Sequence, residues 1–260
     1  MTALDRLALL GRHRQLVYCL VSRDLRVRYK RSVLGVLWAF AEPLVLMLLY
    51  SVVFSLLLRV QTPAYPAFAL AGVVVWGFLH TGVTYSLSSI TQNANLVKKI
   101  YFPREILPLA MVLGRAVHFL LSLFLLVPFL IAFDIRPTPY LLLLPLLVLI
   151  QLVLVLGLAL LFSAVSTLYE DVGFLVNFAF SGLFYLSPVV YPVELVPARF
   201  QTLYLANPIA ALITSYRAVI ISGTPPPWTA LGLAAFTSVL ALALGLFVFR
   251  RVEWSFAEVL

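Results

Sequence analysis

Residues 33–58 read VLGVLWAFAEPLVLMLLYSVVFSLLL, and this apolar stretch decides the fold class. Glu42 is its one charged residue. A helix rises about 1.5 Å per residue, so roughly 20 mostly apolar residues cross the hydrocarbon core of a membrane. The stretch therefore predicts a transmembrane helix.

Apolar stretches of similar length recur along the chain. Four are clear, at 67–89, 106–133, 141–165 and 228–249, and a shorter one covers 172–191. The 260 residues are 63% hydrophobic and 11% charged, with a mean hydropathy of +1.07. Soluble domains are nearer half apolar and a quarter charged. We therefore expect an all-α polytopic membrane protein with six transmembrane helices, forming one transmembrane domain over 33–260.

The residues that carry most catalytic and metal chemistry are scarce. The single cysteine, Cys19, excludes a disulfide framework and a cysteine-based metal site. The three histidines form no HExxH motif, and there is no GxSxG motif and no paired-carboxylate site. No P-loop is present, since the only lysines, Lys30, Lys98 and Lys99, lie outside glycine-rich loops. We expect no cofactor, no metal and no enzymatic activity in this chain, so an energy source must bind from outside or come from an ion gradient.

The first 32 residues predict an N-terminal amphipathic helix in the membrane interface. Eight of the 18 basic residues precede position 32, which gives a juxtamembrane cluster facing anionic headgroups and argues against nucleic-acid binding. The apolar residues of this segment recur at helical spacing: Leu16, Val17, Leu20 and Val21. A solvated helical cap is the alternative.

Residues 193–227 are predicted to form an external or re-entrant helical element. With six spans and a cytoplasmic N-terminus, Lys98, Lys99, Arg250 and Arg251 fall on the cytoplasmic side, as the positive-inside rule requires. A seventh span would leave the two C-terminal arginines outside. Both termini are therefore expected in the cytoplasm.

Two loops face the cytoplasm in this topology. The first, 91–105, reads TQNANLVKKIYFPRE and is longer than a simple connection requires, so it has room for a short helix parallel to the membrane. A positive-inside anchor with no partner is the alternative. The second loop, 166–171, reads STLYED.

Several blocks resemble one family along nearly the whole chain. They are RDLRVRYKRSVLGVLWAFAEPL at 23–44, LVKKIYFPREILPL at 96–109, YEDVGFLVNFAF at 169–180, LSPVVYP at 186–192 and LANPIAALITSYR at 205–217. These blocks are similar to those of ABC-2 type transporter permeases of the polysaccharide export group, which move O-antigen or teichoic-acid polymers. Glu170 departs from the pattern, in which a basic residue precedes the aspartate.

The resemblance implies a six-helix permease that forms a homodimer and sits on two copies of a separate ATP-binding subunit, where ATP and magnesium bind. It implies that 91–105 is a coupling helix docking in the ATPase, and that 193–227 corresponds to short gate helices. The coupling residues would be Asn95, Lys98, Lys99, Tyr101, Phe102, Arg104, Glu105, Glu170 and Asp171.

Aromatic residues in two spans are candidates for a substrate path, because sugars stack their apolar faces on rings. They are Trp38, Phe40, Tyr50 and Phe54 in the first span, and Phe174, Phe178, Phe180, Phe184 and Tyr185 in the fifth. Interface belts and helix packing are the alternative role for such residues. Four basic residues, Arg26, Arg28, Lys30 and Arg31, stand where lipid headgroups or the pyrophosphate of a lipid-linked glycan would lie.

Glu42, His80 and Arg115 are ionisable residues inside predicted spans, where such residues are costly. Glu42 and Arg115 each lie nine residues past the start of a span rising from the cytoplasm, or roughly 14 Å, and His80 reaches the same level from the other direction. We expect an intramembrane polar layer in which Glu42 pairs with Arg115 and His80 is near.

The sequence thus predicts the permease subunit of an ATP-driven exporter of a lipid-linked polysaccharide in the cytoplasmic membrane. Its alternatives are an ABC-2 exporter of a drug or lipid, a secondary transporter with Glu42 and His80 as proton sites, and a membrane enzyme acting on lipid-linked sugar.

Overall fold

The computed structural model describes residues 13–29, 37–100 and 102–260, and every regular element in these ranges is helical. The longer helices are α2 (Arg14–Tyr29), α3 (Trp38–Tyr50), α4 (Tyr65–Leu87), α6 (Ile106–Leu123), α8 (Leu144–Leu168), α9 (Asp171–Tyr185) and α12 (Trp228–Val252). The shorter ones are α5 (Ala94–Lys99), α7 (Leu126–Ala132), α10 (Ala198–Leu205), α11 (Pro208–Arg217) and α13 (Phe256–Val259). Short helical turns complete the order: η2 (Ser51–Leu57), η3 (Thr91–Asn93), η4 (Pro139–Leu143), η5 (Val193–Leu195), η6 (Ala218–Ser222) and η7 (Glu253–Ser255).

Among the described residues, five helical segments are long and apolar enough to cross a membrane, which confirms the predicted all-α, multi-span class. They are Trp38–Leu57, Tyr65–Leu87, Ile106–Ala132, Pro139–Leu168 and Trp228–Ser255. The third is broken between α6 and α7 at Phe124 and Leu125. Pro128 explains this break, because a proline has no N–H to donate and its ring clashes with the carbonyl four residues earlier.

The predicted fifth span, 172–191, is shorter than expected. Its helix, α9, has 15 residues, which cover about 22 Å against a hydrocarbon core of about 30 Å. The helix ends at Tyr185 because Pro188 disfavours helical geometry in the residue before it. A second candidate is the pair formed by α10 and α11 with η6, but the pair is bent by 100° at its break. Such a bend is found in a broken span as well as in a re-entrant loop, so the re-entrant element expected at 193–227 stays a prediction; the name is kept below for α10, α11 and η6.

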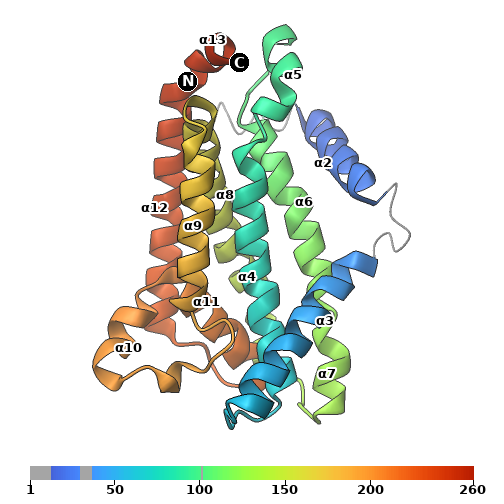
Figure 1. Ribbon diagram of the computed structural model, residues 1–260, viewed down its shortest axis with the longest axis vertical. Coiled ribbons are helices and arrows are strands. Elements are labelled where there is room, and N and C mark those ends of the chain that lie inside the picture. Colours follow the sequence, from blue (N-terminus) through green and yellow to red (C-terminus); the bar gives the residue numbers. More distant parts are fainter. Residues whose placement is uncertain (1–12, 30–36, 101) are drawn as a thin grey trace.

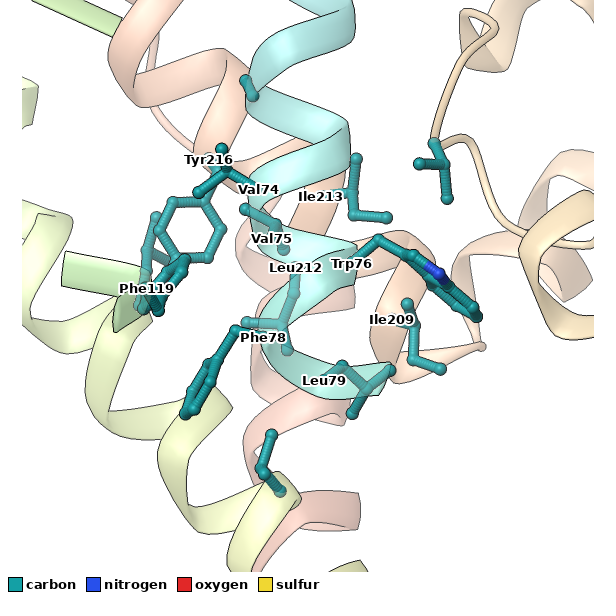
Figure 2. Packing of buried hydrophobic residues seen from close by; sticks show 14 of the residues in the cluster. Val74, Val75, Trp76, Phe78, Leu79, Phe119, Ile209, Leu212, Ile213 and Tyr216 are labelled. Atoms are coloured by element: carbon teal, nitrogen blue, oxygen red, sulfur yellow. The ribbon is translucent and has the colours of Figure 1, made fainter. Parts of the chain in front are cut away.

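The centre of the fold is α4, with α3, α6, α8 and α9 around it (Figure 1). Figure 2 shows how α11 packs against it, with Ile209 and Leu212 of α11 beside Leu79 of α4. On another side of α4, the Phe78 ring stacks on Phe119 of α6 at 4.8 Å. The re-entrant element is therefore part of the core.

Helix α2 packs against the protein with its apolar face. Leu20 is buried in a cluster with Ile106 and Leu107 of α6, and Leu16 and Val17 contact the same cluster. Arg23 of α2 also donates a 2.7 Å hydrogen bond to the side-chain oxygen of Asn93. The predicted interface helix is thus fixed to the end of the bundle that carries α5 and α13 (Figure 1).

Candidate functional site

A cavity of about 370 Å³ opens between α3, α4, α6 and α9. This volume lies within the range of roughly 300 to 1,000 Å³ that is usual for small-molecule sites. Each of the four helices contributes an aromatic or ionisable side chain to its wall. The lining residues with such side chains are Glu42, Tyr50, Trp76, Phe78, His80, Arg115, His118, Phe119, Phe180, Phe184 and Tyr185.

The aromatic wall is centred on Trp76 of α4. Its ring meets Phe180 edge-on at 5.8 Å and Phe184 edge-on at 5.5 Å, and it stacks near His80 at 6.3 Å. Tyr50 of α3 reaches Phe184 at 5.8 Å. Because edge-to-face pairs hold rings in fixed orientations, the wall is a rigid apolar surface. Figure 2 shows Trp76 leaving α4 away from Phe78 and Phe119.

The polar part of the cavity contains all three residues of the predicted intramembrane layer, Glu42, His80 and Arg115. Arg115, however, forms its ion pair with Asp24 of α2, at 3.9 Å between Nη2 and Oδ2. Its guanidinium also lies 3.6 Å from the centre of the Tyr85 ring. The expected Glu42–Arg115 pair stays a prediction, and the observed partner comes from outside the predicted spans.

Sequence reasoning missed Asp24, Tyr85 and Trp76. Asp24 lies on the predicted interface helix, yet its carboxylate is adjacent to a buried arginine in the bundle. A signal was present, because a buried arginine at membrane depth requires a partner and Asp24 is the acidic residue closest to the first span on its N-terminal side. Trp76 and Tyr85 carried no such signal, since aromatic residues are common in every span.

The predicted aromatic path divides into two groups. Tyr50, Phe180, Phe184 and Tyr185 line the cavity. Trp38 of α3 and Phe174 and Phe178 of α9 are exposed and lie outside the cavity lining. Tyr185 both lines the cavity and is exposed. Phe40 is half-buried, and Phe54 stacks on Tyr65 at 6.4 Å. The α9 aromatics therefore offer one exposed stripe and one face turned to the cavity.

The predicted coupling loop is a short helix, α5, preceded by η3 and followed by an extended residue, Ile100. Asn95, Lys98 and Lys99 are exposed on it. Asp171 at the start of α9 and its neighbour Glu170 are exposed as well. These five side chains are accessible to a partner.

Three further coupling candidates are engaged within the chain. Phe102 is buried in a cluster with Phe249 and Phe256. Glu105 is buried and accepts from the Arg250 Nε at 3.5 Å, while Arg104 donates to the backbone carbonyl of Glu253. They hold the loop to the C-terminal end of α12, so any part they play in coupling is through this attachment.

Some predicted residues have no described side chain. Arg26 is exposed on α2, whereas the side chain of Arg28 and the residues Lys30, Arg31 and Tyr101 lie outside the described residues. Their assignment to headgroups, pyrophosphate or coupling stays a prediction. Within the described ranges, no group of three or more His, Cys, Asp or Glu side chains is placed to hold a metal ion.

The similarity to known proteins extends over nearly the whole chain. Residues 15–221 match the family described as ABC-2 type transporter. The sequence is 32% identical over 246 residues to the O-antigen export system permease protein RfbA of Klebsiella pneumoniae, covering 94% of this chain and 95% of the relative. A protein of the same name from Myxococcus xanthus is 33% identical over 251 residues, or 96% of each chain. The polysialic acid transport protein KpsM of Escherichia coli is 22% identical over 244 residues, covering 91% of this chain and 93% of the relative.

Proposed function

Because this chain belongs to the ABC-2 type transporter family, we propose that it is the permease subunit of an ATP-driven exporter that moves a lipid-linked polysaccharide across the cytoplasmic membrane. The observation that carries the proposal is the similarity to O-antigen export permeases along almost the entire length of both proteins. The sequence has no P-loop, so ATP and magnesium bind in a separate subunit, where hydrolysis takes place.

The distribution of charge supports a cytoplasmic position for α5, α13 and the C-terminus, which lie at one end of the bundle (Figure 1). Lys98, Lys99, Arg250 and Arg251 all belong to this end. Loops rich in lysine and arginine stay on the cytoplasmic side of a membrane. In this proposal the N-terminal basic cluster faces the anionic headgroups of the inner leaflet.

The ATPase subunit docks on α5 in this proposal. Asn95, Lys98 and Lys99 are exposed there. Glu170 and Asp171, exposed at the start of α9, would contact the ATPase as well. The buried attachment of Phe102 and Glu105 then passes movement of α5 to α12. Arg26 on α2 and the basic residues that follow it would contact the pyrophosphate or neighbouring headgroups, to which guanidinium groups donate paired hydrogen bonds.

Two copies of the chain form the transporter, with the glycan passing between them. The exposed aromatic residues support this arrangement: Trp38 of α3 with Phe174, Phe178 and Tyr185 of α9. A polymer that slides needs many weak contacts, and exposed rings supply such contacts to the apolar faces of sugars.

Transport by the complete complex tests the proposal. The chain and its ATPase would be reconstituted in vesicles with a lipid-linked glycan, and ATP-dependent movement of glycan would be measured with active and hydrolysis-deficient ATPase. We expect movement only with the active ATPase. Movement that persists with the inactive ATPase and stops when the proton gradient collapses would instead indicate a secondary transporter.

Co-purification tests the docking surface. The double substitution Lys98→Ala with Lys99→Ala removes two exposed charges from α5 without touching the buried cluster around Phe102. We expect the ATPase to be lost from the tagged permease. Arg136→Ala is the matched control, because it removes an exposed charge from the loop before η4. Full retention of the ATPase by the double variant would contradict the assignment.

A further inference from the structure

Arg115 is a buried cation with unused donors. Its side chain is 3% exposed, and its Nε and Nη1 atoms have no hydrogen-bond partner among the described residues. Only Nη2 approaches a carboxylate, that of Asp24, at 3.9 Å. A guanidinium carries five N–H donors in a fixed fork, and buried donors without partners are destabilising. A bound ligand that accepts hydrogen bonds would explain why these donors are left open.

The cavity that Arg115 lines also contains an acceptor. Glu42 lies on its wall, and within the described part of the chain its carboxylate forms no ion pair and accepts no hydrogen bond. The same cavity therefore offers open donors from α6 and an open acceptor from α3. A ligand that fits both has to donate as well as accept.

Aromatic rings form one part of the wall. Trp76 packs edge-on against Phe180 and Phe184, and all three rings line the cavity. The ligand therefore needs an apolar face as well as hydroxyl-type polar groups. A pyranose ring has both, because its C–H groups lie on one face while each hydroxyl both donates and accepts.

An anionic group fits less well. A phosphate at neutral pH offers acceptors and negative charge, and it would stand beside the carboxylate of Glu42, while the charge of Arg115 already faces the carboxylate of Asp24. Uncompensated negative charge is costly at membrane depth. The balance of charge favours a neutral ligand.

We propose that this cavity binds one neutral sugar residue of the transported glycan. The guanidinium of Arg115 donates to a hydroxyl oxygen, Glu42 accepts from another hydroxyl, and the ring of Trp76 covers the apolar face of the sugar. The inference rests on the proposed function and assigns Arg115 and Glu42 as residues that determine which sugars are accepted.

Sugar binding to the intact exporter complex in nanodiscs tests the inference. The probes are the methyl glycosides of glucose, galactose and mannose, and binding is followed by saturation-transfer NMR and titration. We expect at least one probe to bind to the wild-type complex. Arg115→Gln should weaken it about tenfold or more, the change that accompanies loss of a hydrogen bond to a charged group.

A second variant tests the inference even if the Arg115→Gln protein fails to fold. A Cβ added at Gly77 meets no atom within 4 Å, and Gly77 lines the cavity, so we expect the side chain of Gly77→Leu to extend into the cavity without disturbing the backbone packing. We expect this variant to lose the sugar and keep the thermal stability of the wild type. Gly232→Leu is the matched control, because it is equally unhindered and lies on α12, outside the cavity.

The outcomes separate this inference from the proposed function. Binding that is unchanged in both Arg115→Gln and Gly77→Leu would overturn the inference, as would inorganic pyrophosphate binding that Gly77→Leu abolishes. A complex that exports lipid-linked glycan with ATP but binds none of the three glycosides would overturn the inference while the proposed function stands. A complex with no ATP-dependent export would overturn the proposed function itself.

Discussion

Arg217 stabilises the junction between the re-entrant element and the bundle. It is 6% exposed and donates to three backbone carbonyls: Phe68 at 3.1 and 3.0 Å, Val189 at 2.6 Å, and Pro188. Its guanidinium lies 3.4 Å from the centre of the Phe68 ring. Since the carbonyls come from the start of α4 and the turn after α9, one side chain joins three elements. Gly72 permits this, because a Cβ there would collide with the Val189 carbonyl.

Replacing Arg217 with methionine should destabilise the protein strongly. Arg217→Met keeps the length of the side chain but leaves buried carbonyls without donors, at a cost of about 3 kcal/mol or more. We expect the apparent melting temperature of the detergent-solubilised protein to fall by about 5 to 10 °C.

The control for this experiment is Arg199→Met. Arg199 lies on α10, is exposed, and contacts only the neighbouring Phe200 ring at 4.6 Å. Surface substitutions of this kind change stability by less than about 0.5 kcal/mol. Equal melting temperatures for the two variants would show that the carbonyl contacts of Arg217 contribute nothing.

The positions of the helices were largely predictable from sequence, and their rotations were not. The apolar stretches located the spans, and prolines such as Pro128 and Pro188 explain where a helix breaks or ends early. Counting residues placed Glu42, His80 and Arg115 at similar depth, and all three line one cavity. The direction in which each side chain points could not be predicted from the sequence, because spans that are apolar on every side give no periodic signal.

The α8–α12 pair shows how element packing depends on two small residues. A Cβ at Gly157 would meet the backbone of Leu242, and one at Gly245 would meet the carbonyl of Gly157. In a membrane, where lipid is as apolar as the helices, close backbone approach supplies much of the attraction between them. The two glycines therefore set the distance between the longest helices of the fold.

Gly245→Ala should separate these helices. The added methyl group has no room, so we expect a loss of about 1 to 3 kcal/mol, measured as a lower melting temperature. Gly232→Ala on the same helix meets nothing within 4 Å and should leave stability unchanged or raise it by up to about 1 kcal/mol. If both variants had the same melting temperature, close packing at Gly245 would not contribute to the stability of the protein.

At the scale of the whole molecule, the coupling loop and the C-terminal segment form one unit. Phe102 is buried with Phe249 and Phe256, and Glu105 pairs with Arg250. The family resemblance implied that these loop residues contact the ATPase. The sequence could not show that Phe102, Arg104 and Glu105 contact the C-terminal segment, because the two segments are separated by about 145 residues and only folding joins them.

This connection predicts a variant that separates ATP hydrolysis from transport. Glu105→Gln keeps the size of the side chain and removes the charge that holds Arg250, while the exposed lysines of α5 remain available to the ATPase. If movement of α5 reaches the spans through this contact, the reconstituted complex should assemble and hydrolyse ATP, yet export several-fold less glycan per ATP. Glu258→Gln, which removes an exposed carboxylate from α13, should export at the wild-type ratio. An unchanged ratio in Glu105→Gln would mean that the contact between Glu105 and Arg250 does not carry the movement of α5 to the spans.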